Sequence, residues 1–118
     1  MHFDCGTKVI EDLPSPDHRR HAVIFDRDCG ATTGFSTQVS VLPRTRSVND
    51  GGNVFIADTD HGKIPSGRGG GPAVEVTWLD SRTLQIRFRA GARIFKQDSR
   101  HDDIDVRFVA DTALASRP

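Results

Sequence analysis

The sequence predicts a single all-β domain, an antiparallel sandwich or a strongly curled sheet of about seven short strands. Apolar and polar residues alternate over residues 35–42, 74–78, 84–88 and 104–108, and such alternation is typical of half-buried strands. No segment keeps an apolar period of 3.6 residues over three turns, which argues against long helices. Strand-like segments recur every ~8–12 residues between turn residues, as in meandering all-β proteins.

The first third of the chain contains one central strand. Residues 3–10 form a short candidate strand, and residues 13–20 form a turn in which two prolines fix the backbone. Residues 21–27 have an unbroken apolar centre, which predicts a strand buried on both faces. Residues 35–42 form the next strand, which ends at Pro43 because proline cannot donate a ladder hydrogen bond.

The middle of the chain consists mainly of loops. Residues 43–53 are polar and contain an Asp-Gly turn signal, and a short strand over 53–58 follows them. Residues 59–72 form the longest irregular region. Their high glycine content predicts a flexible loop, which is ordered only through contacts from elsewhere in the fold.

The last third predicts a β-hairpin and two further strands. Residues 74–78 and 84–88 alternate on either side of an Asp-Ser-Arg turn. A short strand over 94–95 and a strand over 104–108 follow, and the tail over 112–118 is expected to fray. The predicted core consists of Val23, Phe25, Phe35, Val39, Val41, Val76, Trp78, Ile86, Phe88, Val106 and Phe108.

Length and charge limit the classes of function. A chain of 118 residues is long enough for one domain, residues 1–118, and not for two. The formal net charge is zero, which argues against a nucleic-acid partner. No apolar run approaches the ~20 residues that a membrane-spanning helix needs. The first residues also lack the basic start and apolar run of a signal peptide. The sequence therefore predicts either a cytoplasmic protein or a periplasmic or secreted one whose leader was removed.

Cys5 and Cys29 are the only cysteines. They show no C-x-x-C spacing, and two thiols are too few for a structural zinc site. A disulfide between them would stabilise the fold by about 3 kcal/mol through loop-closure entropy. The alternative is a pair of independent thiols in a reducing compartment.

Thr32 and Thr33 lie between Gly30 and Gly34 in the connection before residue 35. Hydroxyls and exposed backbone N–H groups in such a turn can bind an anion or a partner. The segment lacks the Gly-Lys-Ser/Thr ending and the helix of a phosphate-binding loop. This difference favours a plain β-turn in which the glycines supply positive φ.

Asp58, Asp60 and His61 form the best candidate for a divalent metal site, and the sequence indicates no other cofactor. Alternating carboxylates before Gly62 resemble the start of a calcium loop. No bidentate glutamate follows at the required distance. Surface acids around a turn are therefore the alternative interpretation.

Arg87, Arg89 and Arg107 fall on the polar faces of their predicted strands. If those strands are neighbours, the arginines form a basic patch that could bind an acidic protein, a sulfated glycan or nucleic acid. Glu75 and Asp105 share the same face and predict ion pairs across the strands instead. No aromatic residue is interleaved for stacking on bases.

A set of motifs extends over residues 5–109. The motifs are Ser15-Pro-Asp, Ala22-Val-Ile-Phe, Cys29-Gly-Ala-Thr-Thr-Gly-Phe, Gly52-Asn-Val-Phe-Ile-Ala-Asp and Val74-x-Val-x-Trp. Together they resemble a small family of uncharacterised bacterial domains that often follow a signal peptide or a lipoprotein anchor. The resemblance implies a compact β fold and an envelope or secreted setting.

The candidate residues divide between two classes of function. The first is a non-enzymatic binding or protein-interaction module with an unidentified protein partner. The second is a small hydrolase or metal-dependent enzyme that uses Cys29 or the group Asp58, Asp60 and His61. No complete catalytic constellation is visible in the sequence, which favours the first class.

Overall fold

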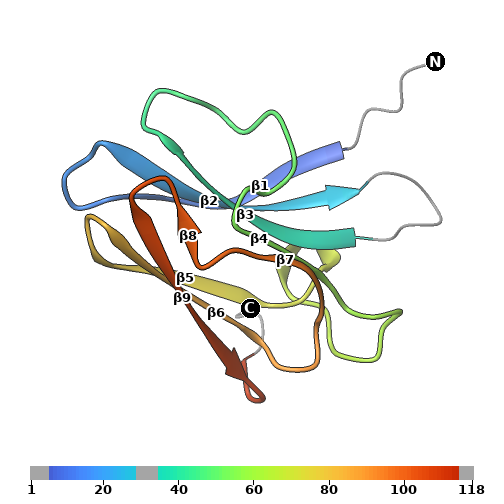
Figure 1. The fold of residues 1–118 in the computed structure, drawn as a ribbon. Helices are drawn as coiled ribbons and strands as arrows, with labels where there is room; N and C mark the ends of the chain where they lie inside the picture. Colours follow the sequence, from blue (N-terminus) through green and yellow to red (C-terminus); the bar gives the residue numbers. More distant parts are fainter. Residues whose placement is uncertain (1–5, 29–34, 115–118) are drawn as a thin grey trace.

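The computed structural model describes residues 6–28 and 35–114 (Figure 1). This part of the chain contains nine strands and one short 3₁₀ turn, η1 (Arg68–Gly70). The all-β prediction is confirmed, with two more strands than the seven or so that the sequence suggested. The strands are β1 (Gly6–Pro14), β2 (Arg20–Asp28), β3 (Phe35–Pro43), β4 (Phe55–Asp58), β5 (Val74–Asp80), β6 (Thr83–Arg89), β7 (Arg93–Gln97), β8 (Arg100–His101) and β9 (Ile104–Asp111).

The strands form two facing sheets, as a sandwich requires (Figure 1). The five-stranded sheet has the order β1-β2-β3-β4-β7, and the four-stranded sheet has the order β5-β6-β9-β8. Among the described strands, six of the seven pairings are antiparallel, and β6 with β9 is parallel. Alternation marks the faces of β6 and β9, and it says nothing about their relative direction. The parallel pair therefore could not be read from the pattern.

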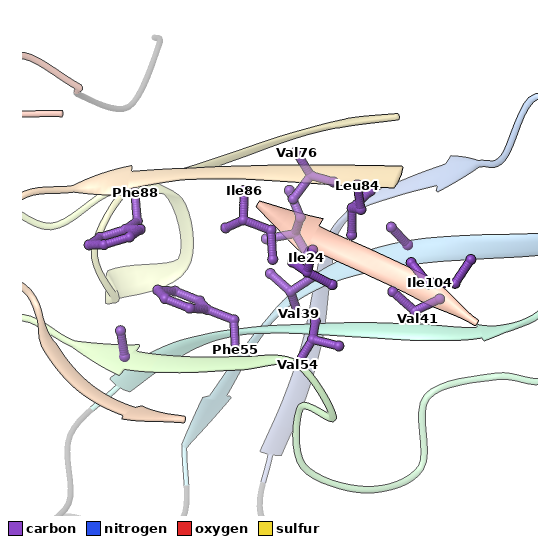
Figure 2. Packing of buried hydrophobic residues seen from close by; sticks show 13 residues of the cluster. Ile24, Val39, Val41, Val54, Phe55, Val76, Leu84, Ile86, Phe88 and Ile104 are labelled. Carbon is purple, nitrogen blue, oxygen red and sulfur yellow. The ribbon is translucent and has the colours of Figure 1, made fainter. Parts of the chain in front are cut away.

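The hydrophobic core fills the space between the sheets. Figure 2 shows Phe55 of β4 and Phe88 of β6 meeting there, and their ring centroids lie 5.3 Å apart. Six of the predicted core residues belong to the buried cluster, and Trp78 and Phe108 pack against it as partly buried side chains. The six are Val39, Val41, Val76, Ile86, Phe88 and Val106.

Val23 and Phe25 are buried on the opposite face of β2, outside this cluster. The connection between β3 and β4, green in Figure 1, arches over this side of the sheet. It is held by hydrogen bonds from Gly52 N to the Gln38 side chain (2.7 Å) and from Asn53 N to Ser40 Oγ (3.1 Å). The unbroken apolar run in β2 therefore has the double burial that the sequence predicted.

The prediction that Phe35 is a core residue is wrong. It begins β3 and leaves 48% of its surface exposed. Its place in the alternation puts it on the inner face, but the end of the strand extends beyond the buried cluster. Alternation assigns a face to a side chain and does not say how far along the strand the other sheet reaches.

The glycine-rich loop is ordered by contacts with the five-stranded sheet. Residues 67–72, here named the glycine strap, contain η1, which packs on β1, β2 and β3. The hydroxyl of Thr37 donates to the carbonyl of Pro72 (2.8 Å). A Cβ on Gly71 would lie 2.5 Å from Thr37 N, so only glycine permits this approach.

Candidate functional site

The predicted metal ligands lie where β4 runs into a tight turn. Asp58 ends β4, and its Oδ1 accepts a hydrogen bond from the backbone N–H of Asp60 (2.8 Å). The residues Asp60, His61 and Gly62 have φ values of 54°, 58° and 81°. Two consecutive non-glycine residues in the left-handed region are uncommon, and such outliers concentrate at functional sites.

Arg93, which the sequence analysis did not select, organises this turn. It stands opposite Asp58 in the β4–β7 ladder. Its Nε donates to Asp58 Oδ1 (3.0 Å), and its Nη2 donates to Asp58 Oδ2 (2.7 Å). Its Nε also lies 4.0 Å from the Asp60 carboxylate, and its Nη1 lies 3.4 Å from His61 Nε2. A guanidinium therefore stands at the centre of the three predicted ligands.

The negative charge of the Asp58 carboxylate is compensated by the guanidinium of Arg93. Asp58 is only 7% exposed. The hydrogen bonds from Arg93 hold the pKa of the Asp58 carboxyl below its ordinary value of 3.8, and the Asp60 N–H acts in the same direction. Since both carboxylate oxygens already accept hydrogen bonds, a metal ion would have to displace Arg93. Within residues 6–28 and 35–114, no group of three or more acidic, histidine or cysteine side chains is arranged to hold a metal.

The same arginine covers an exposed aromatic ring. The guanidinium carbon of Arg93 lies 5.0 Å from the ring centroid of Phe95, two residues along β7. Phe95 is 60% exposed on the edge strand of the five-stranded sheet. We name Asp58, Asp60, His61, Arg93 and Phe95 the Arg93 cluster. It combines an arginine and a phenylalanine ring, and both residue types are enriched in protein interfaces.

The three predicted patch arginines share the outer face of the four-stranded sheet. Arg87 lies opposite Val109, and Arg107 lies opposite Gln85, in the β6–β9 ladder. Arg87 pairs with Asp111 (3.2 Å), and Arg89 donates to the carbonyl of Leu114 (3.2 Å). Arg87 is therefore ion-paired on this face, but its partner is Asp111. Asp105, which the sequence suggested as a partner for these arginines, pairs with Arg100 of β8 instead (2.9 Å).

The remaining predicted site residues, Cys5, Cys29, Thr32 and Thr33, lie outside the described residues. The disulfide and the hydroxyl-bearing turn stay predictions.

The sequence signals for the Arg93 cluster were incomplete. Asp58 and Arg93 are 35 residues apart in the chain, and only the β4–β7 register brings them together. A second missed residue, Asp26, left a clearer signal, because it directly follows the apolar run of β2.

Comparison of the chain with known proteins finds no relative. The chain matches no protein-family model, no curated protein and no solved structure. Among the described residues, no helix has the length and apolar character needed to cross a bilayer.

Proposed function

We propose that this chain is a non-enzymatic protein-interaction module that binds its partner through the Arg93 cluster. One observation carries the proposal: Phe95 stays largely exposed beside an arginine that Asp58 holds in place. An arginine and an aromatic ring that lie together on an exposed edge strand have the composition that is enriched in protein interfaces. The fixed guanidinium reduces the side-chain entropy that binding would otherwise lose.

An envelope or secreted setting is part of this proposal. Its support is the resemblance of the Cys29-Gly-Ala-Thr-Thr-Gly-Phe segment and its companion motifs to bacterial envelope domains.

The metal-dependent alternative has less support. Asp58, Asp60 and His61 would have to release Arg93 before they could converge on a metal ion. Breaking two charge-assisted hydrogen bonds at a nearly buried carboxylate opposes metal binding. An enzyme that uses Cys29 depends on a residue outside the described part of the chain.

Affinity capture with a matched pair of variants tests the interaction. The immobilised wild-type chain, Phe95→Ala and Leu79→Ala are exposed to an extract of the source cells, and retained proteins are quantified by mass spectrometry. Leu79 is the control because it is 46% exposed on the other sheet. We expect a partner that wild type and Leu79→Ala retain and that Phe95→Ala retains about tenfold less, as hot-spot truncation predicts. Equal retention by all three chains would reject the Arg93 cluster as the binding surface.

A further inference from the structure

Asp26 is a buried carboxylate on the inner face of β2. It is 4% exposed, and it stands opposite Lys8 on β1 and Thr37 on β3. Among the residues that the structure describes, no hydrogen-bond donor reaches its Oδ1. Buried polar atoms nearly always have a partner, so this one requires an explanation.

The glycine strap lies directly over this carboxylate. A Cβ on Gly69, where φ is +80°, would lie 2.8 Å from Asp26 Cβ and 3.2 Å from Ile10 Cδ1. A Cβ on Gly70 would lie 2.9 Å from Phe35 Cγ. The strap backbone therefore separates Asp26 and its apolar neighbours from solvent.

Few polar contacts fasten the strap to the sheet. The Thr37 hydroxyl donates to Pro72 O, and Arg68 pairs with Glu11 across 3.5 Å at the surface. An exposed ion pair of this length contributes little. The bond from Gly67 N to Gly71 O (2.6 Å) closes the strap on itself. Segments with so few ties open locally at low free-energy cost.

The charges around Asp26 do not neutralise it. Burial and, to a smaller extent, the charge of Asp28 on the same strand raise the pKa of Asp26. Lys8 on β1 and a backbone hydrogen bond from Arg27 offset only part of this effect, and the resulting pKa is about 6. Arg68 in the strap pairs with Glu11, and β3 presents the uncharged Thr37. An ionised Asp26 is therefore costly while the strap is closed.

We propose that the glycine strap is a pH-sensitive cover, closed over a neutral Asp26 and opened when that carboxylate ionises. Opening admits water to the carboxylate and removes the cost of burying its charge. It also uncovers Ile10 and the covered side of Phe35, which creates an apolar surface at this end of the sandwich. The ionisation of Asp26 drives this opening, because the carboxylate binds its proton more tightly when the strap is closed than when it is open. The opening equilibrium and the ionisation of Asp26 are therefore thermodynamically linked.

Hydrogen exchange of the strap amides tests this cover. The amides of Gly67 and Gly70 donate within the strap, and their exchange is followed by NMR from pH 5 to pH 7.5 after division by the intrinsic rates. We expect the opening equilibrium to rise about tenfold over this range, the value given by linkage between a pKa near 6 in the closed state and an ordinary one in the open state. In Asp26→Asn the equilibrium should not change with pH. A wild-type equilibrium that is flat with pH overturns the proposal.

Two further measurements separate Asp26 from its surroundings. Glu11→Gln removes the ion pair to Arg68, and it should loosen the strap equally at every pH while the pH dependence persists. Loss of the pH dependence in Glu11→Gln would assign the effect to the ion pair and reject Asp26. If Asp26→Asn does not fold, the carboxyl ¹³C titration of wild-type Asp26 decides, since titration at the ordinary pKa of an aspartate contradicts the proposal.

Discussion

At the scale of residues, the ion pair between Asp58 and Arg93 joins parts of the chain that are 35 residues apart in sequence. It ties the end of β4 to the edge strand β7 with two charge-assisted hydrogen bonds. Asp58 is nearly buried, whereas the Arg93 side chain is 40% exposed. Removing Arg93 should therefore destabilise the protein more than removing Asp58, because it leaves a buried carboxylate charge without a partner.

A double-mutant cycle should show this asymmetry. We expect Arg93→Gln to lower the urea midpoint more than the double variant Arg93→Gln/Asp58→Asn does, because the double variant leaves no buried charge unpaired. Midpoints at neutral pH from circular dichroism measure the effect. If the double variant loses as much stability as the sum of the single variants, the two side chains act independently.

The same pair has a defined pH dependence. The pKa of Asp58 is lower in the folded protein than the ordinary 3.8. Its contribution to stability is therefore fully present above the ordinary pKa and is lost as pH falls through the folded pKa. The difference between wild type and Arg93→Gln should accordingly shrink below pH ~4.

At the scale of elements, the glycine strap shows how a glycine-rich loop can have a defined position, because its backbone packs closely on a sheet. Its glycines let the backbone approach β3 more closely than any side chain would allow. Gly71 has φ −83° and ψ −177°, a conformation that other residues also adopt. The requirement for glycine at this position is therefore steric, and it comes from Thr37.

Gly71→Ala should consequently destabilise the domain by about 2 kcal/mol, the range found for overpacked sites. Gly51→Ala is the matched control, since its Cβ would meet only the Gln38 side chain at an ordinary 3.6 Å. Thermal unfolding of both variants measures the difference. Equal melting temperatures would mean that the strap shifts away from β3 without cost.

The strands in which apolar and polar residues alternate could be predicted from the sequence. The features that depend on which strands pair with each other could not. The hairpin of β5 and β6 follows from Val74, Val76, Ile86 and Phe88, which alternate on either side of a turn. The short β8 has only two residues, which carry no period. The Arg93 cluster was only half predicted, because its acidic side is local in sequence and its arginine arrives through the register of β7.

At the scale of the whole molecule, a hydrogen bond connects a strand of one sheet directly to a strand of the other. The indole Nε1 of Trp78 on β5 donates to the carbonyl of Leu13 on β1 (2.9 Å). Trp78 was predicted as a core residue. It lies partly buried against the core, where its polar edge serves as a tie between the layers.

Trp78→Phe keeps most of the apolar surface and removes this donor. We expect a loss of about 1 kcal/mol, the net value of one hydrogen bond, and a fall of the melting temperature by ~5 °C for a domain of this size. Circular dichroism measures the change, because the variant has no tryptophan for fluorescence. Leu79→Ala, which alters an exposed neighbour, should leave the melting temperature unchanged.

The route of the chain between β6 and β9 has a consequence for folding. These parallel partners belong to the four-stranded sheet, yet β7, which lies between them in sequence, belongs to the other sheet. The chain between β6 and β9 therefore passes through the five-stranded sheet, where β7 pairs with β4. Each sheet thus depends on the other for its assembly, and the contacts that close the domain are distant in sequence. Such a topology folds slowly and in one cooperative step, so the two sheets should form and melt together.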